Sequence, residues 1–176
     1  YSLDVGGAVA LQRLAFLSPY LAKLHGQVQL GAKDACAPLA GGFRITGALD
    51  APEAAGRVSI AGVELLARGY PREIRIRSGE LDVSGRLDTG DVAIRIPEED
   101  RVQARHDEGT FSLWGTVDLA AWVPDRVELD ATGSNIFISV PRQYRLTMNP
   151  TLHLSLRHPF AATNASGLLR GKVALT

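Results

Sequence analysis

The sequence of 176 residues predicts an all-β chain folded as one long curved antiparallel sheet with an apolar concave face. One ten-residue pattern occurs three times: a glycine, alternating apolar residues, a central glycine and a final aspartate, at 41–50, 79–88 and 109–118. Apolar and polar residues also alternate from Glu73 onward, and parallel strands would need crossover helices that the sequence lacks. A repeated strand favours a sheet extended by similar units over a closed sandwich.

The three copies of this pattern predict half-buried strands. Apolar residues two apart share one face of a strand, so each copy presents an apolar row. The central glycines Gly47, Gly85 and Gly115 interrupt that row, which indicates a bend, a bulge or the close approach of another segment. The apolar rows contain Phe43, Ile45, Leu49, Leu81, Val83, Leu87, Phe111, Leu113 and Val117.

The remaining chain supplies one predicted helix and several short strands. Leucines spaced three and four apart at 11–24, with Ser18-Pro19 as a cap and first turn, predict a short helical element at about 10–24. Short alternating runs at 127–129, 136–140, 144–148 and 152–156 predict strands closed by Pro141, Pro150 or Pro159. We interpret residues 1–176 as a single segment of a longer repetitive β domain.

Composition excludes several classes of protein. With 19 basic and 19 acidic residues the chain has no net charge, which argues against a nucleic-acid binder with a broad phosphate footprint. Cys36 is the only cysteine, so neither an internal disulfide nor a cysteine-based zinc site is expected. There is no apolar run of membrane-spanning length and no export leader, so any membrane anchor is expected outside these residues.

We find no pattern typical of a catalytic site, and we expect no enzyme activity, no cofactor and no metal. His106, in a charged stretch, and His153, on the polar side of a strand, are predicted to be surface histidines. Asp50, Asp88 and Asp118 end the three copies, where an aspartate usually caps a turn. Trp114 is predicted to cover the neighbouring glycine from the polar side.

Several stretches together resemble the TamB family, within the AsmA-like group. The family repeats an apolar-any-Gly-any-apolar unit, a proline-containing turn and Gly-any-Val. Matching stretches are Leu49–Val58, Val140–Asn149, Leu152–Leu156 with Pro159 and Gly167, and Gly171–Val173. The leucine-rich stretch from Leu11 to Gly26 resembles the short helical element between such repeats.

This resemblance implies a U-shaped half-pipe with an apolar lining, in the periplasm of a diderm bacterium, within a protein anchored in the inner membrane. It also implies a TamA-type outer-membrane barrel partner, and work in outer-membrane biogenesis by carrying phospholipid between the two membranes or by assisting outer-membrane protein assembly. Acyl chains or unfolded outer-membrane proteins would contact the concave face. The predicted groove consists of the apolar rows of the three copies, listed above, together with Ile138, Leu146 and Leu154.

Two alternatives use the same residues differently. In a structural or adhesive β-solenoid, the apolar positions form a sealed core. In a strand-donating chaperone, the open edge near Val173 pairs with client strands of β-barrel proteins.

Overall fold

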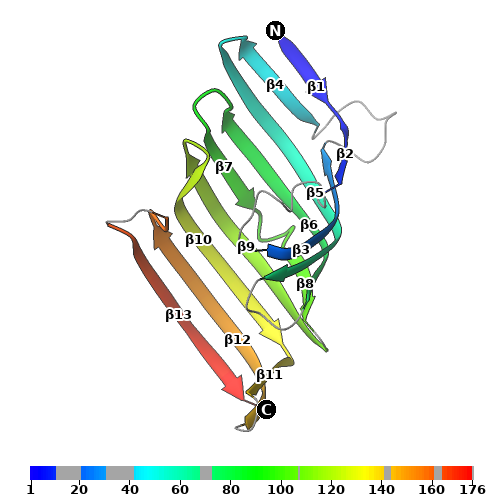
Figure 1. The fold of residues 1–176 in the computed structure, drawn as a ribbon, viewed down its shortest axis with the longest axis vertical. Helices are drawn as coiled ribbons and strands as arrows, with labels where there is room; N and C mark the ends of the chain where they lie inside the picture. The colour runs from blue at the N-terminus through cyan, green and yellow to red at the C-terminus, as the bar shows by residue number, and fades with distance from the viewer. Residues whose placement is uncertain are drawn as a thin grey trace.

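The fold is known from a computed structural model, which describes residues 1–10, 21–30, 42–67, 73–106, 108–140, 144–160 and 164–175. These residues contain thirteen strands in one antiparallel sheet and no helix (Figure 1). The predicted all-β class and antiparallel sheet are confirmed. The strands are β1 (Ser2–Val5), β2 (Gly7–Ala10), β3 (Leu21–Leu30), β4 (Phe43–Ala48), β5 (Ala51–Ala67), β6 (Ile74–Arg86), β7 (Asp91–Ile96), β8 (Val102–His106), β9 (Gly109–Ala120), β10 (Val123–Ser134), β11 (Ile136–Val140), β12 (Tyr144–Arg157) and β13 (Ser166–Leu175).

The sheet is an up-and-down meander. Its strands follow the order β1, β4, β5, β6, β7, β9, β10 and β12, and β13 pairs with β12. Shorter strands share neighbours with these: β3 also pairs with β5, β8 lies between β6 and β9, and β11 pairs with β12. Most successive strands therefore pair with each other, the exceptions being β1 and β2, β3 and β4, β7 and β8, and β10 and β11.

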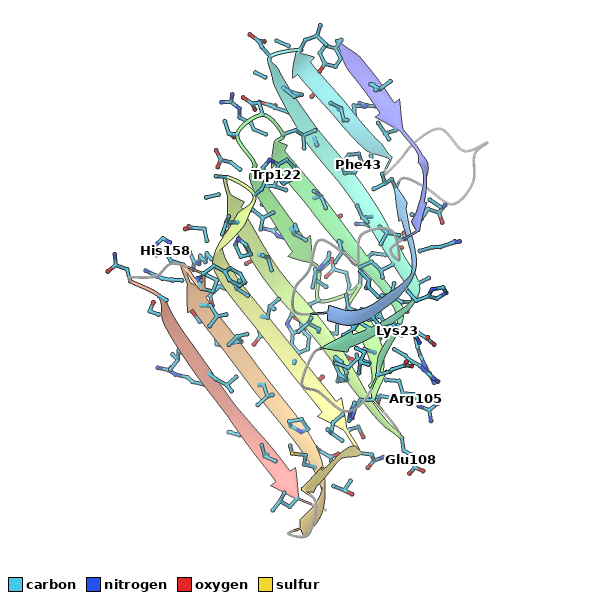
Figure 2. The ribbon with its side chains drawn as sticks, in the orientation of Figure 1. Lys23, Phe43, Arg105, Glu108, Trp122 and His158 are labelled. Atoms are coloured by element: carbon cyan, nitrogen blue, oxygen red, sulfur yellow. The ribbon has the colours of Figure 1, made fainter. Side chains whose placement is uncertain are left out.

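Four connections lie along one rim of the sheet: β4–β5, β6–β7, β9–β10 and β12–β13. Figure 2 shows Trp122 and His158 near this rim, and Arg105 and Glu108 near the opposite one. The Trp122 amide donates a hydrogen bond to the Gly90 carbonyl at 3.0 Å, which joins two of these turns. In Figure 1, β3 and the end of β5 lie at a steep angle to the central strands, so the sheet bends strongly on that side.

The central glycines of the repeat lie where a neighbouring strand comes close. Gly115 has a φ of 134°, and a Cβ atom there would lie 2.1 Å from the Glu128 carbonyl oxygen. A Cβ atom at Gly85 would lie 2.2 Å from the Asp91 carbonyl oxygen. Both contacts are with backbone, so only glycine fits, and of the three predicted explanations the structure shows the close approach of another segment.

Local irregularities keep apolar residues on one side of the sheet. In β5 the apolar positions change from Val58 and Ile60 to Val63, on either side of Gly62 with a φ of 61°. Asn135, with a φ of 55°, likewise separates β10 from β11. A single extra residue reverses the alternation of a strand, so these breaks restore the apolar side after each bend.

Two predictions about secondary structure are wrong within the described residues. Ala10 belongs to strand β2 and Leu21 to Leu24 belong to strand β3, not to a helix; the rest of the predicted helix, at 11–20, lies outside the described residues. A register shift between Leu21 and Lys23 inserts an extra residue, so a spacing of three does not require a helix. Pro150 does not end a strand: β12 passes through it, at the point where the neighbouring strand changes from β10 to β11.

Candidate functional site

One side of the sheet carries continuous rows of apolar side chains across the strands. In register, Val83, Ile94, Val117, Val127 and Leu156 lie side by side on β6, β7, β9, β10 and β12. We call the side of the sheet that bears this row the apolar face. A second row crosses the same face and consists of Val102, Leu113, Ala131 and Leu152.

Burial on this face is incomplete. The buried hydrophobic residues all lie there, yet among the described residues no large side chain is below 2 % exposure. The chain exposes 11416 Å², whereas a compact monomer of 18.8 kDa exposes about 8,300 Å². Exposure is highest on the outer strands, where Leu3 on β1 and Leu169 on β13 are 55 % and 64 % exposed. The described strands therefore form one layer whose apolar face stays partly open.

Most predicted groove residues lie on this face. They are half-buried, and they are Phe43, Ile45, Leu81, Val83, Phe111, Leu113, Val117 and Leu154. Ile138 and Leu146 are register partners on β11 and β12, but their side chains are outside the described part of the structure.

Leu49 and Leu87 are the two predicted groove residues that lie outside the strands. Both follow the end of a strand and lie in turns; Leu87 is half-buried, whereas Leu49 is 86 % exposed. The first two copies of the repeat turn at this point, whereas the third continues through Val117 to Ala120. Leu49 therefore does not belong to the apolar face.

The sequence prediction missed part of the face. Val92, Ile96, Val102 and Val127 are among its most buried members, although none belongs to a copy of the repeat. The signal that identifies them is their alternation in β7, β8 and β10.

A pocket of about 200 Å³ opens on the apolar face near the break between β10 and β11. It is lined by Ile74, His106, Phe111, Ala131, Thr132, Gly133, Ile136, Pro150 and Leu152. The prediction that His106 is a surface residue is wrong: it is 5 % exposed, because β8 places it on the apolar face in register with Gly109.

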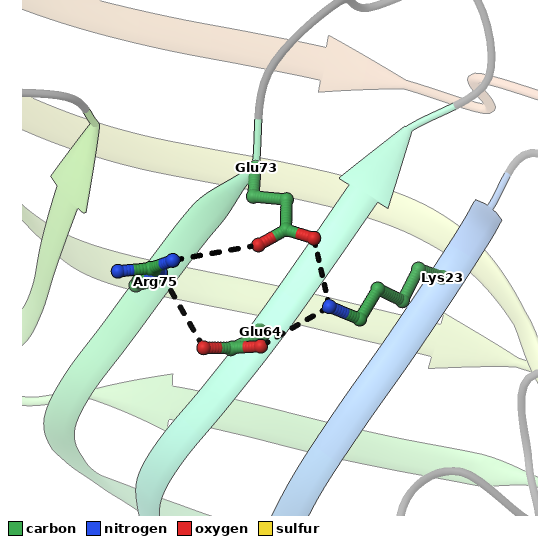
Figure 3. Close-up of polar contacts among 4 residues, drawn as sticks. All are labelled: Lys23, Glu64, Glu73 and Arg75. Atoms are coloured by element: carbon green, nitrogen blue, oxygen red, sulfur yellow. Dashed lines mark hydrogen bonds and ion pairs between the residues drawn. The ribbon is translucent and has the colours of Figure 1, made fainter.

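The opposite face carries charged side chains in ion-paired clusters. Figure 3 shows Lys23, Glu64, Glu73 and Arg75 from β3, β5 and the start of β6 in one ring of contacts. The Lys23 Nζ lies 2.7 Å from the Glu73 carboxylate and 3.2 Å from that of Glu64. The Arg75 guanidinium completes the ring, 3.4 Å from Glu64 and 3.7 Å from Glu73. Its hydrogen bond with Lys23 lowers the pKa of the Glu73 carboxyl group, and the same contact raises the pKa of Lys23.

A second cluster holds the β7–β8 connection against this polar face. The Arg57 guanidinium contacts Asp82 at 3.1 Å, Glu80 at 3.0 Å and Asp100 at 3.5 Å. The neighbouring Arg101 guanidinium lies 4.2 Å from the centre of the Trp114 ring, a cation–π contact. The polar face therefore carries charged side chains that ion pairs join across neighbouring strands.

His153 belongs to the polar face as predicted. Its Nδ1 atom lies 2.9 Å from the Asp130 carboxylate, and its Nε2 atom is 3.5 Å from Glu128. Across the described residues, no group of three histidine, cysteine, aspartate or glutamate side chains is placed to hold a metal ion. No helix in that part of the chain is long and apolar enough to cross a membrane.

Comparisons with protein families, with curated proteins and with solved structures found no match to this chain. The arrangement itself therefore carries the functional argument. It combines a partly open apolar face with a charged opposite face on a single layer of strands.

Proposed function

We propose that this chain is a non-enzymatic, groove-forming segment that binds the acyl chains of phospholipids along its apolar face. The observation that carries the proposal is the partly open, continuous apolar face of a single-layered sheet. A soluble monomer rarely exposes a large apolar surface unless that surface binds something.

The length of the face suits a lipid tail. From β1 to β13 the sheet takes eight steps between neighbouring strands, which span about 38 Å at roughly 4.8 Å per step. Exposing a chain of about sixteen carbons to water costs on the order of 10 kcal/mol, at about 0.8 kcal/mol per methylene. A row of Val, Ile and Leu side chains across the strands offsets most of that cost, because it replaces water along the chain.

The proposal includes a shape and a cellular setting. We propose that the sheet curls into a U-shaped half-pipe, supported by the steep angle of β3 and the end of β5 to the central strands (Figure 1). The setting is that of a TamB-type protein: periplasmic, anchored in the inner membrane through parts outside these residues, and paired with a TamA-type outer-membrane barrel. There it would carry phospholipid between the membranes or assist outer-membrane protein assembly.

Quenching by brominated phospholipid tests this proposal. In a background of Trp114→Phe and Trp122→Phe, a single tryptophan is placed at Leu113 on the apolar face or at Ser112 on the polar face. Bromine atoms on the acyl chain quench a tryptophan that they contact. We expect quenching at position 113 and little at position 112, because adjacent strand residues point to opposite faces. Equal quenching at both positions, or none at either, would contradict the proposal.

The free edge of β13 favours a second candidate, strand pairing with an unfolded outer-membrane protein. Among the described residues β13 pairs only with β12, and all ten of its residues are exposed. Such an edge is a template for a further strand. A crosslinker at Arg170 that captures an unfolded barrel protein, while position 113 captures no lipid, would favour this candidate.

A further inference from the structure

We propose that the pocket near the break between β10 and β11 holds the methyl end of a single acyl chain. The inference rests on the proposed function and adds a fixed end point to the apolar face. Its starting point is the pocket's place on that face: Phe111, Ala131 and Leu152 line it and belong to the rows of the apolar face. A chain lying along these rows can enter the pocket without crossing a polar surface.

Gly133 and the break between β10 and β11 create the pocket. A Cβ atom at Gly133 would lie 2.9 Å from both Ile136 and Pro150, so a larger residue there would crowd the lining. Asn135, with a positive φ of 55°, turns the chain between β10 and β11, and its amide donates to the Asn149 side chain at 2.8 Å. The lining residues Gly133 and Ile136 flank this turn.

The pocket has the size and chemistry for hydrocarbon. An engineered, enclosed apolar cavity of about 150 Å³ binds benzene, and this pocket, which is open on one side, has a volume of about 200 Å³. A methylene group is about the size of a water molecule, which occupies about 30 Å³. The pocket therefore has room for roughly six or seven methylene groups. Among the described residues that line the pocket, His106 is the only titratable one, and the lining is otherwise almost entirely apolar. The methyl end of a chain is the part that fits.

Nuclear magnetic resonance with palmitate tests the position of the chain end. Palmitate labelled with ¹³C at its terminal methyl is added to the protein. Contacts between the lipid and the methyl groups of Ile74 and Ile136 are then measured. We expect contacts from the terminal methyl to both residues, and none from the methylene next to the carboxylate.

Chemical and mutational controls sharpen this test. The affinity for the analogue 16-hydroxypalmitate should be at least about fivefold lower than for palmitate, because the pocket would bury an unpaired hydroxyl group. Ala131→Phe fills the pocket and should weaken palmitate binding at least tenfold, since losing two buried methylenes already costs roughly that factor. The matched control Thr110→Phe places the same ring on the polar face of β9, outside the pocket, and should leave affinity within about threefold.

The outcomes separate this inference from the proposed function. If palmitate binds but its methyl end contacts only Leu113 or Leu154, or if the hydroxyl analogue binds equally well, the pocket proposal is wrong and the groove proposal stands. If palmitate binds nowhere on the apolar face, both proposals fail.

Discussion

Replacing Gly115 by alanine should destabilise the sheet strongly, because the neighbouring strand leaves no space for a side chain. The added Cβ atom would lie 2.1 Å from the Glu128 carbonyl oxygen and 2.9 Å from the Leu129 Cα atom. Both atoms are backbone atoms of β10, so neither moves without disturbing the ladder. A φ of 134° also strains any residue other than glycine. Backbone strain and overpacking each cost about 1–3 kcal/mol, so we expect a loss of about 2–6 kcal/mol.

Urea denaturation followed by circular dichroism measures this loss. With a slope of about 2 kcal/mol per molar urea, the midpoint should fall by roughly 1–3 M. The control is Gly6→Ala, since Gly6 has no positive φ and a Cβ atom there meets only the Leu30 carbonyl oxygen at 3.9 Å, an ordinary contact; its effect should stay below about 0.5 kcal/mol. An unchanged midpoint for Gly115→Ala would refute the close approach of β9 and β10 as the reason for this glycine.

Two further predictions concern the two faces of the sheet. Leu113→Asp should keep the sheet folded while abolishing phospholipid binding, whereas Val58→Asp, at a 6 % exposed position, should unfold it; lipid binding and circular dichroism distinguish these results. Because the folded pKa of Glu73 lies below its ordinary value, its contribution to stability is present above about pH 4.5 and is lost as the pH falls through the folded pKa. Glu73→Gln should therefore show less acid destabilisation than the unchanged chain in urea titrations at pH 6 and pH 3.

Each of these two predictions has one result that would contradict it. If Leu113→Asp unfolds the chain as completely as Val58→Asp, the apolar face is a sealed core. If Glu73→Gln loses stability in acid as steeply as the unchanged chain, the ring of contacts around Lys23 does not contribute to folding.

The alternation of apolar and polar residues predicted the class of fold and most of the candidate site. Phe111, Leu113 and Val117 lie on the apolar face because a strand of period two leaves them no other place. The central glycines were partly interpretable from sequence, since a missing side chain in an apolar row indicates a bend, a bulge or a close approach, and the structure shows the last of these. Local pattern thus determined which residues share a face.

Strand ends and bulges could not be predicted from the same pattern. Leu49 continues the alternation of β4, yet the chain turns before it, and the pattern contains no information about where pairing stops. Asp118, expected to cap a turn, lies within β9 opposite Arg126, because the third copy does not turn there. The neighbours of His106 are charged, which conceals that its own side chain belongs to the apolar face. Each of these positions depends on register with another strand.

Site-specific photo-crosslinking in a diderm bacterium tests the open apolar face most directly. A photoreactive residue replaces Leu113 on the apolar face, or Thr116 on the polar face of the same strand as the control. We predict covalently attached phospholipid at position 113 and none at position 116. Crosslinks from position 113 that reach only other residues of this chain would contradict the open groove and identify the apolar face as a closed core.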